Sequence, residues 1–267
     1  LEGNEATPQD LATADAAAEF LRERNTEDSF FLSVGLTNTH QPMPLDQDRI
    51  DPNRVQPPGP LPDVEPVRRE MAAYQVLAEY VDQCVGTVIE GLEDGGHRDE
   101  TLIVFTTDHG IPFPYMKCDL WDDGIGVSLI ASFPDGPSGT CEDGLVSTMD
   151  LYPTFCDFLN TPIPGWVEGP SLGPLLDGEI DTVREAIYSE VNYHGAYEPK
   201  RCVRTRRYKY IRRFDEEYTR EVGPNTDNGP SKEFLTERGL LERKRPRVAL
   251  YDLYHDRKNS LVGKVAK

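Results

Sequence analysis

The sequence predicts an α/β fold in which a mixed, mostly parallel sheet is flanked by helices and followed by a small antiparallel sheet. The uncharged, apolar run at 102–105 is typical of a strand buried within a parallel sheet. Apolar residues recur every three or four positions over 71–92, which indicates a helix that crosses the sheet to reach that strand. Beyond residue 180, several short segments are typical of antiparallel strands.

The composition is that of a globular protein and excludes several classes. The 267 residues are 37% hydrophobic and 9% aromatic, which suits a folded core. The net charge is −19, from 47 acidic and 28 basic residues, and it argues against nucleic acid as a partner because a phosphate backbone requires a positive surface. Either a well-solvated surface or adaptation to high salt explains this acidity. No run approaches the roughly 18 apolar residues of a membrane span, so we expect no membrane association.

The chain begins Leu1-Glu-Gly-Asn, without an initiator Met or a signal-peptide pattern, and we interpret this start as an internal cut. Thr7 as N-cap and Pro8 at the first helical position predict a helix that ends near Asn25. The apolar run at 30–36 then predicts a buried strand.

Polar residues follow each of the two predicted buried strands directly. His40 follows the first strand, while Asp108 and His109 follow the second, where Gly110 allows a sharp turn. Ligands bind beyond the carboxyl ends of strands in open α/β sheets, so we expect these side chains to lie in a site. For His40 taken alone, a purely structural role stays open.

Between these two strands, the proline-rich stretch at 42–66 predicts a long surface loop, and Gly95-Gly96 ends the predicted crossover helix. A further strand is expected at 127–133. A short helix follows, with Pro153 in its first turn.

The proline- and glycine-rich stretch at 162–177 predicts a boundary between a catalytic α/β part at 1–180 and a small α+β subdomain at 181–267. The antiparallel strands expected in this subdomain are 186–191, 202–205, 208–211 and 248–256. Eight basic residues lie between Lys200 and Arg213. They form either a cationic lip for an anionic substrate or a hairpin whose charges balance acidic neighbours.

Four residues carry the candidate chemistry. Asp108 supplies a hard oxygen ligand for a divalent cation, and His109 supplies a nitrogen ligand more typical of zinc or manganese. Lys117, on a loop that contains two prolines, is a compact charge suited to an oxyanion. His40 is a candidate acid for a leaving group, because imidazole ordinarily titrates near neutral pH.

Several motifs occur in a fixed order: Thr39-His40-Gln-Pro, Thr-Thr-Asp108-His109-Gly, Met-Lys117-Cys and Leu-Trp-Asp-Asp-Gly-Ile-Gly-Val, then Asp150-Leu-Tyr-Pro-Thr. Together they resemble the C-terminal half of the sulfatase family, in the alkaline phosphatase superfamily, and are most similar to its N-sulfoglucosamine sulfohydrolase-like members. The resemblance runs from about Phe30 to about Leu261 and implies the alkaline-phosphatase-like sheet predicted above.

The resemblance also implies roles. His40 points at the scissile sulfate ester, Lys117 contacts a sulfate oxygen, and Asp108 and His109 bind a divalent metal. Calcium is the metal that the family generally uses, with zinc and manganese as the alternatives. The implied substrate is a sulfated small molecule or glycan. In the family, the nucleophile is a formylglycine made within a C/S-x-P-x-R motif, and none of the five cysteines here lies in one. We expect that motif in an N-terminal half, so this stretch alone should be inactive.

Two other functions stay open at this point. One is a metal-dependent phosphodiesterase or phosphatase of the same superfamily, which a Thr or Ser nucleophile upstream would reveal. The other is a non-catalytic remnant or binding module, which a natural start codon directly before Leu1 would favour.

Overall fold

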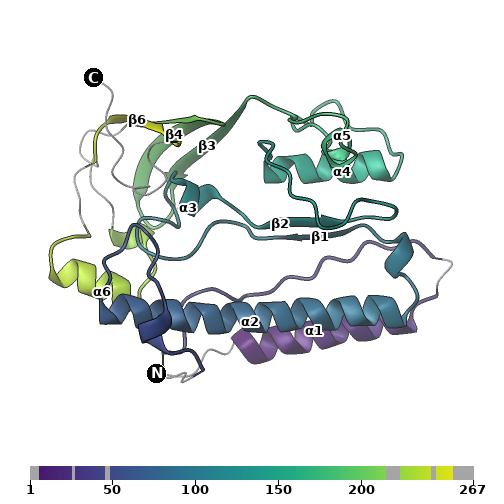
Figure 1. The fold of residues 1–267 in the computed structure, drawn as a ribbon, viewed down its shortest axis with the longest axis horizontal. Helices are drawn as coiled ribbons and strands as arrows, with labels where there is room; N and C mark the ends of the chain where they lie inside the picture. The colour runs from purple at the N-terminus through teal and green to yellow at the C-terminus, as the bar shows by residue number, and fades with distance from the viewer. Residues whose placement is uncertain (1–5, 26–27, 46–48, 215–222, 242–244, 255–267) are drawn as a thin grey trace.

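The computed structural model describes residues 6–25, 28–45, 49–214, 223–241 and 245–254. Helices α1 (Ala6–Glu23) and α2 (Glu65–Asp94) run side by side along one face of the molecule, below the strands (Figure 1). Short 3-10 turns lie at Pro52–Arg54, Arg98–Glu100, Thr148–Asp150 and Gly223–Asn225. The chain start at Leu1 and the end of the expected last strand at Asp256 lie outside the described residues.

The two long helices approach each other closely at Gly91. A Cβ atom there would lie 2.5 Å from Cα of Ala18, which is itself fully buried. Helix α2 begins at Glu65, earlier than its apolar repeat, because Pro66 is well tolerated in a first turn. It ends where expected, before Gly96 with its φ of +74°.

The predicted strand at 102–105 forms as β1 (Ile103–Thr106), but its expected parallel pairing is wrong. It pairs antiparallel with β2 (Leu129–Ser132), with Thr106 opposite Leu129. A parallel neighbour needs a crossover to the opposite end of the sheet. Here the motif-bearing chain between the two strands returns at the same end, so antiparallel pairing results. The ribbon is also only partly buried, where the sequence predicted a buried strand.

The apolar segment at 30–36 forms no strand. It runs extended between the helical layer and β1 (Figure 1). None of the described residues pairs with this segment as a neighbouring strand, and its Phe31 side chain is 80% exposed.

In the second half of the chain the predicted short helix and the predicted C-terminal strands form, whereas the helices at 173–176 and 230–237 were not predicted. A 3-10 turn leads into α4 (Leu151–Phe158), whose first turn contains Pro153, and α5 (Gly173–Leu176) follows. The four C-terminal strands form one antiparallel sheet in chain order: β3 (Ala186–Tyr193), β4 (Tyr197–Thr205), β5 (Tyr208–Arg213) and β6 (Val248–Asp252).

The loop after β1 connects two hydrophobic cores, and this positions the site. Phe113, Tyr115 and Met116 pack into a core with α2 and α6 (Pro230–Glu237). A few residues later, directly before α3 (Asp122–Ile125), the chain joins a second core on the C-terminal sheet. There Trp121 meets Tyr251 edge-on, with ring centroids 4.6 Å apart.

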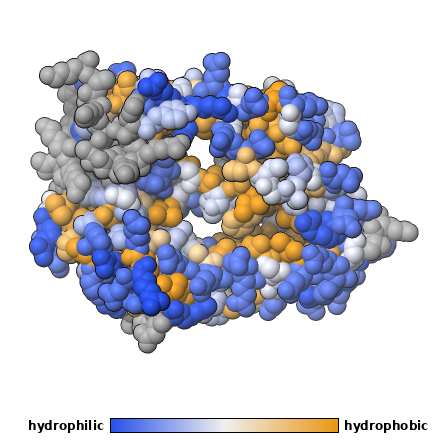
Figure 2. Space-filling model, viewed as in Figure 1, coloured by the Kyte–Doolittle hydropathy of each residue, from blue (hydrophilic) through white to orange (hydrophobic). Residues whose placement is uncertain are grey.

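The outer surface is mainly hydrophilic, but apolar side chains are visible along the middle of the molecule, between the helical layer and the strands (Figure 2). Ile130, Leu159 and Trp166 are 63%, 72% and 74% exposed. None of the helices in the described ranges has the length and hydrophobicity needed to cross a membrane.

Candidate active site

Two buried carboxylates hold the loop that carries His40. Asp10 of α1, which is 2% exposed, accepts hydrogen bonds of 2.8 Å from two successive backbone N–H groups that precede the histidine. From α2, the buried Glu70 accepts a hydrogen bond from the side-chain amide of Gln41. The loop is therefore fixed on both sides of His40, although it forms neither helix nor strand.

The ring of His40 faces Lys117. Its Nδ1 lies 2.6 Å from the carbonyl oxygen of Gln41, and because that oxygen only accepts, Nδ1 carries the proton. Nε2 then presents its lone pair, and Nζ of Lys117 donates to it at 3.1 Å. The two residues are 77 positions apart in the sequence, and the fold brings both predicted catalytic side chains into direct contact.

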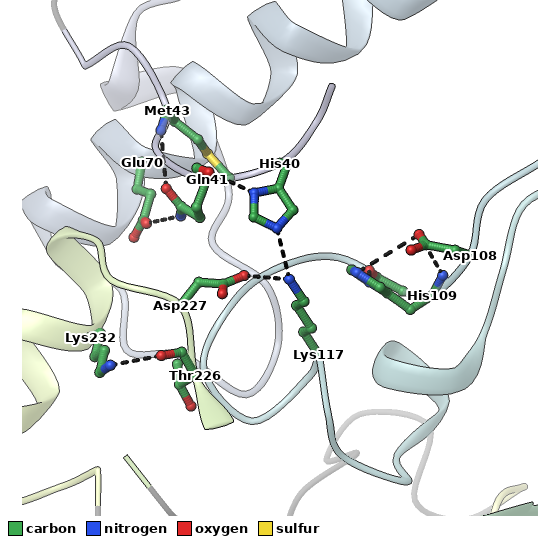
Figure 3. Close-up of polar contacts among 11 residues, drawn as sticks. His40, Gln41, Met43, Glu70, Asp108, His109, Lys117, Thr226, Asp227 and Lys232 are labelled. Atoms are coloured by element: carbon green, nitrogen blue, oxygen red, sulfur yellow. Dashed lines mark hydrogen bonds and ion pairs between the residues drawn. The ribbon is translucent and has the colours of Figure 1, made fainter. Parts of the chain in front are cut away.

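Lys117 makes a second contact that sequence reasoning missed. Its Nζ donates to Oδ2 of Asp227 at 2.7 Å, and its side chain is 8% exposed. Figure 3 shows Lys117 held between His40 and Asp227. The run Asn225-Thr-Asp-Asn-Gly-Pro reads as an ordinary polar turn. No sequence signal therefore marks Asp227, which lies 110 residues from its partner.

Asp108 and His109 lie side by side at the end of β1, as predicted. The Asp108 side chain is 89% exposed, and its Oδ1 lies 3.8 Å from Nε2 of His109. Nδ1 of His109 donates to the carbonyl oxygen of Gly110 at 2.6 Å, which leaves the Nε2 lone pair for a ligand. Metal-binding histidines commonly have this backbone contact on the opposite nitrogen.

These two residues form only part of a coordination shell. Among the described residues, no group of three or more His, Cys, Asp or Glu side chains is arranged to bind a metal. No hydrogen bond or ion pair among the described residues links Asp108 or His109 to the His40–Lys117 contact.

Gly110 lies in a bend of the chain at 108–110, where the sequence predicted a sharp turn, and it also allows a close approach of two backbone segments. A Cβ atom on Gly110 would lie 1.9 Å from the carbonyl oxygen of Asp123, and one on Gly124 would lie 2.1 Å from that of Met116. The Gly110 N–H also donates to the Gly124 carbonyl at 2.9 Å. The Asp-His-Gly and Trp-Asp-Asp-Gly motifs therefore pack backbone against backbone, which fixes the strand end that carries Asp108.

A buried ion network anchors the loop two residues beyond Lys117. Oδ1 of Asp119 lies 3.2 Å from Nζ of Lys200, which also contacts Glu198 at 3.0 Å. Burial alone would raise the pKa of Asp119, but the cations Lys200, Arg213 and Arg245 outweigh it and lower that pKa to about 2.

Acidic side chains also pair with the other residues of the basic run from Lys200 to Arg213. Lys209 and Arg204 contact Asp122, and Arg201 contacts Glu190. The charges balance acidic neighbours, three of the basic side chains are buried, and the cationic-lip interpretation is wrong for them.

Comparison with known proteins gives the family of the chain. The family model described as Sulfatase matches residues 3–161, and the model described as N-sulphoglucosamine sulphohydrolase, C-terminal, matches residues 110–229. The chain belongs to the sulfatase family.

Individual sulfatases support the assignment. N-sulphoglucosamine sulphohydrolase of Homo sapiens is 31% identical over 175 residues, which cover 60% of this chain and 34% of that protein. The structure of a 2-O GAG sulfatase superposes with a TM-score of 0.64 at 20% identity, covering 97% of this chain and 59% of the other. A protein solved in complex with its substrate D-glucosamine-2-N,6-O-disulfate superposes with a TM-score of 0.56 at 22% identity, covering 72% of this chain and 36% of the other. The α/β class is thereby confirmed. The chain spans 34% of the length of the human relative, about a third.

Proposed function

We propose that this chain is part of a sulfatase that hydrolyses a sulfate ester or N-sulfate of a sugar-like substrate. The contact of 3.1 Å between Lys117 and His40 carries the proposal, because it joins two groups that such a reaction needs at one point. Membership of the sulfatase family and a relative named for N-sulphoglucosamine hydrolysis support this substrate class.

In the proposed mechanism, Lys117 neutralises charge on a sulfate oxygen, and His40 delivers a proton to the leaving oxygen or nitrogen. Nδ1 keeps the proton that it donates to the Gln41 carbonyl, so Nε2 is the atom that first takes up a proton from solvent and then passes it to the leaving atom of the substrate. Because Lys117 already donates to Nε2, we infer that the substrate oxygen enters beside both groups. Preorganised charges of this kind act without reorganising during the reaction.

Asp108 and His109 are the proposed ligands of a divalent metal, and calcium is the proposed ion, on the family resemblance. Asp108 offers an exposed carboxylate and His109 an unprotonated Nε2, so both fit the role in part. A metal bound there would polarise the sulfate group. The family's formylglycine nucleophile would have to come from outside these residues.

We also propose the division of the chain into a catalytic part, 1–180, and a C-terminal subdomain, 181–267.

The test uses the natural full-length protein with three sulfate substrates: D-glucosamine N-sulfate, D-glucosamine 6-sulfate and 4-nitrophenyl sulfate. We expect His40→Ala and Lys117→Ala each to lower kcat/KM by about 100-fold or more, the usual scale for a lost general acid or charge clamp. Arg22→Ala is the matched control, because Arg22 forms an exposed ion pair with Asp94 at the far end of the helices.

Metal analysis of the same preparations tests the metal site. Asp108→Ala and His109→Ala should lose bound metal, and the metal recovered from the unmutated protein identifies the ion. Phosphate diesters form the opposing arm of the activity assay. Faster turnover of a phosphate diester than of any sulfate would replace the sulfatase proposal with the phosphodiesterase alternative.

A further inference from the structure

The carboxylate of Asp227 lies beside Lys117, where a negative charge weakens the binding of an anion such as sulfate. It contacts the ammonium group of Lys117 at 2.7 Å and neutralises much of the charge that would attract a sulfate group. A carboxylate in this position lowers the affinity for a bare anion. Its presence therefore indicates a compensating role toward another part of the substrate, or toward Lys117 itself.

The segment around Asp227 is held firmly by neighbouring residues. Asn225 and Thr226 are 5% and 7% exposed. The Asn225 side chain accepts from the backbone N–H of Ala196 at 2.7 Å and donates to Glu198 at 3.0 Å. Lys232 donates to the Thr226 carbonyl at 2.7 Å and to the Asn228 side chain at 2.9 Å.

The same buried network holds both partners of the Asp227–Lys117 pair. Glu198, which binds Asn225, also binds Lys200, and Lys200 binds Asp119. Asn225 lies two residues before Asp227, and Asp119 lies two residues after Lys117. The positions of the two charges are therefore set together by one rigid frame.

Within this frame, one carboxylate oxygen of Asp227 is engaged and the other is available. Oδ2 accepts from Lys117, whereas Oδ1 has no hydrogen-bond partner within the described part of the chain. The side chain is 22% exposed, so a ligand can reach it. A carboxylate oxygen accepts hydrogen bonds but cannot donate one, so its natural partner is a hydroxyl or amino group.

We infer that Asp227 is a specificity-determining residue that accepts a hydrogen bond from a hydroxyl or amino group next to the sulfated position of a sugar. Its Oδ2 holds Lys117 toward the sulfate while its Oδ1 receives the neighbouring donor. The inference rests on the proposed function, because it assigns the sulfate to Lys117. It adds that a sulfated sugar with an adjacent hydroxyl or amine is preferred over an aryl sulfate that lacks one.

The kinetic test compares Asp227→Asn with the natural full-length protein on D-glucosamine N-sulfate, whose sulfated position at C2 is flanked by hydroxyls at C1 and C3, and on 4-nitrophenyl sulfate. A hydrogen bond to a charged group predicts a fall of about 10- to 100-fold in kcat/KM for the sugar sulfate. The aryl sulfate should lose no more than about 3-fold, because Asn keeps an oxygen that can accept from Lys117. Equal losses on both substrates would reduce Asp227 to a support for Lys117 and overturn the inference. Asp94→Asn, in the exposed Arg22 ion pair, is the matched control.

A binding test separates this inference from the proposed function, since it requires no turnover. The affinities of D-glucosamine and of inorganic sulfate are measured by calorimetry or NMR titration for both proteins. Asp227→Asn should weaken glucosamine binding while leaving sulfate binding unchanged or tighter, because a repelling charge is removed. This pattern without sulfatase turnover would support the inference and reject the proposed function. Unchanged glucosamine binding would overturn the inference, whatever the turnover.

Discussion

Oδ1 of Asp119 lies 3.2 Å from Nζ of Lys200, and each side chain is only 1% exposed. Asp119 also lies 3.9 Å from the buried Arg213 and accepts a 2.7 Å hydrogen bond from the Leu120 N–H. This ion pair joins the loop of Lys117 to the C-terminal sheet. The candidate site is therefore built on a buried charge network, not on the central strands alone.

Asp119→Asn should destabilise the protein strongly. The substitution keeps the shape of the side chain but leaves buried cations without their counter-charge, and breaking a buried pair in this way costs about 3–5 kcal/mol. Urea denaturation of the natural full-length protein measures the free energy of unfolding. The control is Asp94→Asn, whose ion pair has side chains 43% and 62% exposed and should contribute at most about 1 kcal/mol. Similar losses in the two variants would show that the buried network contributes no more than a surface pair.

The same residue predicts how stability depends on pH. The pKa of Asp119 is lowered from 3.8 to about 2 in the folded protein, so its contribution is present above pH about 4. It should be lost as the pH falls from about 4 to about 2, because the carboxyl group is then protonated in both states. The difference in unfolding free energy between the unmutated protein and Asp119→Asn should therefore shrink across this window. A difference that stays constant down to pH 2 would contradict the assignment.

Glu70 is expected to position two parts of the site at once. It is 1% exposed, receives the side chain of Gln41 next to His40, and accepts from the Ser231 N–H at 2.8 Å at the start of α6. Burial raises its pKa, so its contribution is present below its ordinary pKa of 4.5 and is lost as the pH rises through the folded value. This dependence is opposite in sign to that of Asp119.

Glu70→Gln replaces one accepting oxygen with a donor and should cost about 1–3 kcal/mol. Hydrogen exchange should speed up at the Ser231 amide and at the Met43 amide, which donates to Gln41 at 3.1 Å. Amides of the β4–β5 hairpin serve as the internal reference. If only one of the two amides responds, Glu70 supports a single segment and the proposed double role is wrong.

Sequence patterns predicted α1, α2, α4, the C-terminal sheet and the candidate residues His40 and Lys117, because each depends on local periodicity or on an ordered motif. The short helices α3, α5 and α6 were not predicted. They did not predict Asp10, Glu70 or Asp227, since each acts on a segment at least 27 positions away and has no local signature. The antiparallel pairing of β1 with β2 was missed for a related reason. An apolar run predicts a strand, but its partner depends on the path of the connecting chain.

Residues 1–267 on their own should be poorly stable and aggregation-prone. Phe31, Ile130 and Trp166 are 80%, 63% and 74% exposed, and the two-stranded ribbon has open edges on which another chain can pair.

The net charge of −19 adds repulsion that salt screens, since the Debye length falls from about 30 Å at 0.01 M to about 10 Å at 0.1 M ionic strength. Thermal unfolding at these two ionic strengths should give a higher midpoint in the higher salt, and a dye that binds exposed apolar surface should fluoresce in both. Turnover of 4-nitrophenyl sulfate by residues 1–267 should be absent, because no third His, Cys, Asp or Glu among the described residues completes a metal site with Asp108 and His109, and the sequence contains no formylglycine motif. Metal-dependent turnover by this stretch alone would show that its catalytic site is already complete.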